Sequence, residues 1–239
     1  MKLNIKELLG FFDDETESRG HATAIVGVLG EDLNASVFKH YLEERGSKVI
    51  IFDGPVTQGT KVGLRLDRWI YVESKNSTKT LYQCEIKSWS ATAFGGRSLA
   101  INIDKENLKN ISQYHWDQQK KVFSTGVVPN YVSKVFLRMN SYRNNNLKQY
   151  LEKQNIINYD QKPLLIYWMP ISSDKKDSKP FFNEKVSNLD VRFSNSFKSI
   201  DIFSVSLYFR YLLGEGKEYI DLEMPHFEHR MKVITKFQK

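Results

Sequence analysis

The chain has 239 residues, of which 41% are hydrophobic and 13% aromatic, so it carries enough apolar material for a packed core and is not globally disordered. Its formal net charge of +7 suits a polyanionic partner such as nucleic acid, although many equally basic proteins bind nothing anionic. The single cysteine, Cys84, excludes an internal disulfide and a multi-cysteine zinc site. The N-terminal residues are too polar for a signal peptide and no long apolar run is present, so we expect a cytoplasmic protein without a membrane span.

The spacing of apolar residues predicts helices and strands that alternate along the chain. The first half is expected to contain a helix at 5–12, a long helix at 21–45 ended by Gly46, strands at 48–52, 62–73, 81–89 and 98–103, and a helix at 105–123. The second half is expected to contain strands at 131–139, 163–170 and 219–222, helices at 147–154, 200–213 and 225–237, and an exposed loop at 172–179. This alternation indicates a mixed α/β domain.

Glu85 and Lys87 form an acid-x-lysine tripeptide inside a predicted strand. The tripeptide occurs at five other places, all in loops or at element ends, so by itself it carries no weight. Within a strand, however, alternate side chains share a face, and Ile86 between them would point into the core. Burying a carboxylate and an ammonium is costly unless they pair or bind a metal. A surface ion pair on an exposed hairpin remains the simpler alternative.

Asp67 lies on the preceding predicted strand, and in a hairpin it can face Glu85. Two carboxylates that converge on one point repel each other unless a cation joins them. Oxygen ligands of this kind suit Mg²⁺ or Mn²⁺, and a lysine two residues from a ligand could orient or deprotonate an attacking water. Asp53 is a rival for the aspartate, but the sequence Asp53-Gly54-Pro55 is typical of an ordinary turn.

These motifs together resemble the PD-(D/E)xK nuclease superfamily, in particular its restriction-endonuclease-like and Holliday-junction-resolvase-like branches. The resemblance covers residues 21–90 and rests on a Gly-x-x-Gly-Glu helix with a Tyr-Leu-x-x-x-Gly end, followed by a strand with one Asp and a strand with Glu-x-Lys. The matching residues are Gly27, Gly30, Glu31, Tyr41, Leu42, Gly46, Asp67, Glu85 and Lys87. Leu66 departs from the motif, since proline would precede the aspartate.

The resemblance implies an αβββαβ core, a mixed sheet flanked by helices. It implies that Asp67 and Glu85 hold Mg²⁺ or Mn²⁺, that Lys87 activates water, and that Glu31 is a further ligand or metal-water contact. We expect residues 1–125 to form this nuclease core, and residues 126–239 to be an α/β extension that completes the sheet within one continuous domain. The implied activity is hydrolysis of phosphodiester bonds in nucleic acid, with DNA as the expected substrate and RNA left open.

Residues outside the core motif are expected to approach the phosphate backbone. Gln113 lies on the helix after Glu-x-Lys, where the superfamily often has a glutamine or a basic residue. Arg97, Lys120 and Lys121 are further candidates for phosphate contacts, although solvated positions would explain them equally well.

The aromatic segment with Tyr208, Phe209 and Tyr211 suggests an interface, hence a homodimer or a complex with a partner ATPase in restriction or anti-phage defence. The alternative function is a non-catalytic module of the same fold that binds nucleic acid or protein.

Overall fold

The computed structural model describes residues 1–11, 19–52, 68–87, 110, 112–114, 116–117, 145–174, 179–185 and 198–236. Within these ranges, side chains are not described at 19–29, 145–148, 226, 230, 233 and 234.

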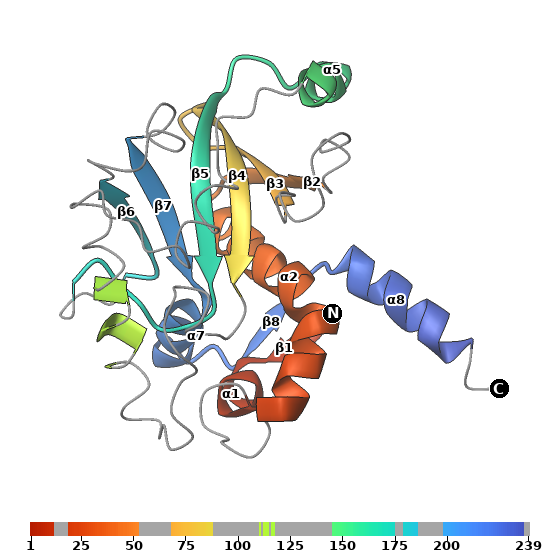
Figure 1. The fold of residues 1–239 in the computed structure, drawn as a ribbon, viewed down its shortest axis with the longest axis vertical. Helices are drawn as coiled ribbons and strands as arrows, with labels where there is room; N and C mark the ends of the chain where they lie inside the picture. Colours follow the sequence, from red (N-terminus) through yellow and green to blue (C-terminus); the bar gives the residue numbers. More distant parts are fainter. Residues whose placement is uncertain are drawn as a thin grey trace, which may run out of the picture.

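The centre of the molecule is a mixed six-stranded sheet in the order β2-β3-β4-β5-β7-β6 (Figure 1). Its strands are β2 (Lys48–Phe52), β3 (Arg68–Glu73), β4 (Lys79–Lys87), β5 (Asp160–Tyr167), β6 (Phe181–Lys185) and β7 (Ser199–Ser204). β4, β5 and β7 run parallel, whereas β2, β3 and β6 are antiparallel to their neighbours. Because β4 pairs with β5, the two halves of the sequence build one continuous sheet.

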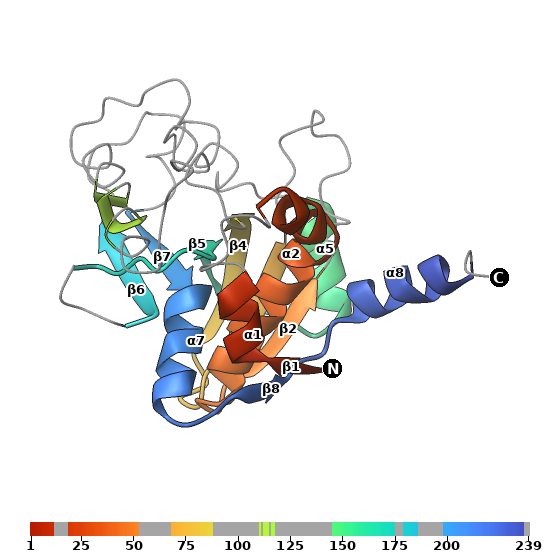
Figure 2. The same cartoon turned by 90° about the horizontal axis from the view of Figure 1, so that it is seen from below.

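Helices flank this sheet, and a second, two-stranded sheet joins β1 (Lys2–Asn4) to β8 (Tyr219–Asp221). The helices are α1 (Ile5–Leu9), α2 (Arg19–Glu43), α5 (Asn145–Lys153), α7 (Val205–Gly214) and α8 (Pro225–Thr235). Both overall views show α8 projecting away from the rest of the described chain (Figures 1 and 2). Among the described helices, none has a stretch both long and apolar enough to cross a membrane.

The long helix α2 covers one face of the sheet, which we call the α2 face. Its Phe38 ring packs edge-on against Tyr82 of β4, with ring centroids 6.0 Å apart, and lies 5.0 Å from the ring of Phe203 of β7. α7 lies on the same side of the sheet, as Figure 2 shows. The hydroxyl of Tyr208 on α7 is hydrogen-bonded to Nδ1 of His40 on α2, at 2.9 Å. These aromatic contacts fix α2 over the central strands.

The helix boundaries follow local chemistry. Gly46 has a φ of +77°, which is the left-handed conformation expected of a glycine just after a helix. Asn4 caps α1 by accepting a hydrogen bond from the Glu7 amide at 3.2 Å. Asp32 of α2 accepts one from the Phe227 amide at 2.8 Å, and so caps α8 from another helix.

The prediction of three consecutive strands after Gly46 is confirmed, as are the packing of the long helix on them and the helical start at Pro225. The helix predicted at 200–213 is wrong in its first five residues, which belong to strand β7; Ser204 caps the helix that follows, accepting from the Leu207 amide at 3.3 Å. β7 is short and buried on both sides, and it leads directly into the apolar helix α7, so its few apolar residues did not separate it from the helix that follows.

Three smaller differences concern strands and a loop. Strands β1 and β6 were not predicted from the sequence. The expected exposed loop begins with Ser172, which is fully buried. The strands expected at 98–103 and 131–139 lie outside the described residues.

Candidate functional site

The candidate site lies on the face of the sheet opposite α2. Strand alternation puts Tyr82 on the α2 face, and therefore puts Gln83, Glu85 and Lys87 of β4 together on the other face, which we call the Glu85 face. This agrees with the expectation that Glu85 and Lys87 point the same way. β4 is an interior strand with neighbours on both sides, so this row of polar side chains crosses the middle of the sheet.

Glu85 and Lys87 form a buried ion pair. The Glu85 side chain is fully buried, the Lys87 side chain is 20% exposed, and Lys87 Nζ lies 2.5 Å from Glu85 Oε1. A carboxylate without solvent would be strongly destabilising without such a partner. The surface ion pair on an exposed hairpin is therefore excluded for Glu85, and Lys87 is the partly exposed member of the pair.

Apolar residues flank the pair on the same face. The register aligns Glu85 with Leu165 of β5, Leu165 with Ile202 of β7, and Ile202 with Phe182 of β6. Trp116 covers the far end of this row, edge-on to the Phe182 ring with centroids 5.9 Å apart. The polar character of the Glu85 face is thus concentrated on β4 in this region.

Asp67 and its rival Asp53 lie outside the described residues, as do Arg97, Lys120 and Lys121. The described part of β3 begins one residue after Asp67, at Arg68, which pairs with Cys84 of β4.

Glu31 does not join Glu85 and Lys87. Its Oε2 accepts a hydrogen bond from the Arg68 guanidinium at 2.9 Å. Arg68 pairs with Cys84, so strand alternation puts it on the α2 face, with the sheet between it and Glu85. The described contact of Glu31 is therefore an ion pair between α2 and the start of β3.

Gln113 is used inside the fold. It is buried, and its Oε1 accepts from the Ser172 amide at 3.1 Å, while its Nε2 donates to the Ser172 carbonyl at 3.1 Å and to Asp117 Oδ1 at 3.1 Å. The Gln113 amide thus supplies the hydrogen bonds that the Ser172 backbone, in the loop after β5, would otherwise make with another backbone segment. The expectation of a phosphate contact finds no support in this geometry.

The residues present fit a divalent cation only in part. Among the described residues, no three His, Cys, Asp or Glu side chains gather into a metal-binding group. Glu85 supplies one carboxylate of the kind that Mg²⁺ and Mn²⁺ accept, and sites for these ions often use one or two protein carboxylates beside water and phosphate oxygens. Asp67, the second carboxylate that the sequence predicts, lies outside the described residues.

Sequence reasoning missed two buried polar groups. Gln83 is fully buried beside Glu85 and was not singled out, although its place in the Gln-x-Glu-x-Lys pattern is a signal. On the α2 face, Tyr82 donates to Asp201 Oδ2 at 3.1 Å, and Asn183 donates to Asp201 Oδ1 at 2.6 Å. Burial and the Asp201 carboxylate raise the pKa of Tyr82 well above its usual range, so the hydroxyl stays protonated and donates.

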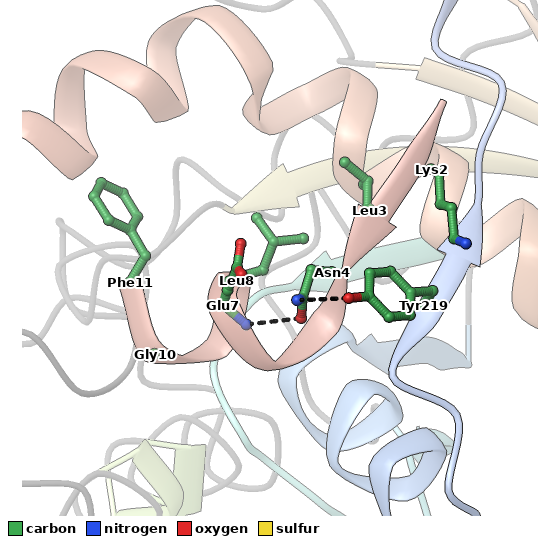
Figure 3. A pocket seen from close by; sticks show the side chains of 8 residues that line it. All are labelled: Lys2, Leu3, Asn4, Glu7, Leu8, Gly10, Phe11 and Tyr219. Carbon is green, nitrogen blue, oxygen red and sulfur yellow. Dashed lines mark hydrogen bonds between the residues drawn. The ribbon is translucent and has the colours of Figure 1, made fainter.

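An open hollow of about 800 Å³ lies elsewhere, between β1, α1 and β8 (Figure 3). Its lining includes Lys2, whose amine lies 4.7 Å from the centre of the Tyr219 ring, and Asn4, whose Nδ2 donates to the Tyr219 hydroxyl at 3.5 Å. No residue of the six-stranded sheet lines it. The hollow is therefore separate from the Glu85–Lys87 pair.

The aromatic segment of α7 is mostly core. Tyr208 and Phe209 are buried, and only Tyr211 is exposed. The sequence argument for an interface there loses two of its three residues.

Comparison with known proteins adds no relative: no family model, curated protein or solved structure matches the chain.

Proposed function

We propose that the chain is a Mg²⁺- or Mn²⁺-dependent nuclease that hydrolyses phosphodiester bonds, with DNA as the expected substrate and Asp67, Glu85 and Lys87 as its cutting centre. The observation that carries the proposal is the buried Glu85–Lys87 pair on an interior strand.

The topology around the pair gives further support. Among the described elements, α2, β2, β3 and β4 are followed by the helical residues 112–114 and 116–117, by helix α5 and by β5, which is parallel to β4. This succession is compatible with the αβββαβ order that the resemblance to restriction-endonuclease-like nucleases implies, and so it supports the proposal. The β3–β4 register, if it continued by one pair, would align position 67 with Glu85. The proposal therefore assigns the second carboxylate to Asp67.

In this proposal each residue has a separate task. Asp67 and Glu85 hold the cation, which when bound supplies positive charge beside the scissile phosphate. Lys87 turns its amine from Glu85 toward the attacking water, orients that water and stabilises the hydroxide that forms. The partial exposure of the Lys87 side chain suits this task, because a fully buried side chain could not turn toward water. Glu31 is not assigned a ligand role, since it pairs with Arg68.

The second candidate function is a non-catalytic module that binds nucleic acid or protein. It is favoured by one observation: Lys87 already neutralises Glu85, so the pair is electrostatically complete without a cation. Under this alternative the pair is structural.

Cleavage by the full chain separates the two functions. Supercoiled plasmid, single- and double-stranded oligonucleotides and a structured RNA are incubated with Mg²⁺, Mn²⁺ or EDTA. We expect metal-dependent cleavage that is lost in Asp67→Ala and Lys87→Ala. Lys75→Ala is the matched control, because Lys75 ends another acid-x-lysine tripeptide but lies exposed in a turn. Absence of cleavage, or full cleavage by Asp67→Ala, contradicts the proposal; the second result directs the same test to Asp53.

Restriction or anti-phage defence, with a homodimer or a partner ATPase, is the proposed setting. Recovery of the tagged chain from its own cells, with light scattering of the purified protein, tests this setting. A strict monomer without a partner would count against it.

A further inference from the structure

Gln83 is a buried amide without a partner among the described residues. The side chain is fully buried, and neither its Oε1 nor its Nε2 makes a hydrogen bond there. A buried polar group without a hydrogen bond destabilises the fold, so its presence calls for a role in another state of the protein.

The neighbours of Gln83 restrict what it can bond to. On the Glu85 face, its neighbours along β4 are Leu81 and Glu85, and its register partners are Trp69 of β3 and Pro163 of β5. Leu81 and Pro163 offer no polar side-chain atom. Among these four described neighbours, Trp69 and Glu85 are the ones with a polar side-chain atom.

The chemistry of these two neighbours is complementary to an amide. The indole Nε1 of Trp69 is a donor only, and it has no partner among the described residues either. A carboxylate is an acceptor only, with room for several hydrogen bonds besides the one from Lys87. A glutamine amide has one acceptor and one donor group, so it can join the indole to the carboxylate.

We propose that Gln83 is the positioning residue of Glu85: in the cation-loaded protein, Trp69 Nε1 donates to Gln83 Oε1, and Gln83 Nε2 donates to the Glu85 carboxylate. The bond orients the carboxylate after Lys87 has turned to the attacking water. This inference rests on the proposed function, because it needs a cation at Glu85. Hydrogen bonds to a ligating carboxylate typically change metal affinity by about 10- to 100-fold.

The test uses Gln83→Leu, which removes both polar atoms at similar size. We expect the affinity for Mn²⁺, measured by calorimetry on the full chain, to fall at least about 10-fold. The melting temperature should stay the same or rise, since an unpaired buried amide has been removed. In wild-type protein, the side-chain amide signal of Gln83 in ¹H–¹⁵N spectra should shift when Mg²⁺ is added.

Gln161→Leu is the matched control. Gln161 lies on the same face, as the register partner of Leu81, and its Nε2 also lacks a partner among the described residues. It is remote from Glu85 along the strand, so its removal should leave Mn²⁺ affinity unchanged.

The outcomes separate the two hypotheses. If wild type binds Mn²⁺, Glu85→Gln does not, and Gln83→Leu binds as wild type does, the inference on Gln83 is overturned while the proposed function stands. A lower melting temperature for Gln83→Leu with unchanged Mn²⁺ affinity would likewise overturn it, because the amide would then be structural. If wild type neither binds Mn²⁺ nor cleaves, the proposed function fails and the inference fails with it.

Discussion

Gln113 is the residue whose two possible roles differ most in their consequences. As a phosphate contact it would affect activity and not stability; as a tie for the loop after β5 it would affect stability first. The change Gln113→Leu removes the acceptor of the Ser172 amide and the donor to the Ser172 carbonyl, each at 3.1 Å. Ser172 is itself fully buried, so water does not replace these partners without a rearrangement of the loop.

The expected loss follows from these two backbone groups. Leaving a buried donor or acceptor unsatisfied costs about 1–3 kcal/mol. Two such groups cost about 2–6 kcal/mol, and burying a leucine returns about 1.5–3 kcal/mol, so the net loss in the free energy of unfolding is about 1–3 kcal/mol. Urea denaturation followed by circular dichroism measures this quantity at equilibrium.

A neighbouring residue supplies the control. Tyr114→Leu introduces the same side chain one position away, at a residue that is 58% exposed, and should change the free energy of unfolding by no more than about 0.5 kcal/mol. The reasoning would be refuted if Gln113→Leu were as stable as wild type but bound nucleic acid more weakly. That result would return Gln113 to the phosphate-contact role expected from the resemblance.

Three further predictions concern ion pairs and a histidine. The Glu31–Arg68 pair should give a coupling of about 1 kcal/mol in a double-mutant cycle of Glu31→Ala and Arg68→Met, measured by urea denaturation. If Glu31→Ala instead weakens Mn²⁺ binding in the Arg68→Met background, Glu31 is a metal ligand. Lys87→Met should abolish cleavage yet tighten Mn²⁺ binding in calorimetry, because the positively charged Lys87 amine no longer competes with the metal for Glu85. Unchanged or weaker Mn²⁺ binding would contradict this competition. Burial lowers the pKa of His40 below its ordinary value of 6.5; the charge of Glu44 opposes this shift and that of Lys217 adds to it. As the pH falls, the unfolded chain therefore takes up the proton first. The contribution of neutral His40 to stability is therefore complete above about pH 6.5 and is lost as the pH falls below that value. His40→Gln should flatten the dependence of the free energy of unfolding on pH in this range. An unchanged slope would show that another group titrates there.

The features predicted correctly from the sequence are those set by local periodicity. Alternation along one strand is enough to put Glu85 and Lys87 on the same face, because it depends on no other element. Gly46 is similar, since a glycine that follows a helical pattern takes the left-handed conformation for local steric reasons.

The features that were missed depend on tertiary neighbours. Glu31 lies on a helix, where each residue is rotated from the last, and the motif does not say which face of the sheet that helix covers. The strand at 199–204 has six residues and leads directly into helix α7, so its short Ile-Asp-Ile alternation was not enough to separate it from the helix. Gln113 looked like a polar surface residue because the loop that uses its amide is distant in sequence.

The row Gln83, Glu85 and Lys87 is a poor solution for stability alone. A buried ion pair is often no more stable than well-packed apolar residues of similar size. The adjacent amide of Gln83, which has no hydrogen-bond partner among the described residues, is less favourable still. Leucine or isoleucine at these positions would suit the flanking Leu165 and Ile202 equally well. The three polar residues therefore suit the proposed function, in which Glu85 would hold a cation, Lys87 would meet water, and Gln83 would bond to the Glu85 carboxylate.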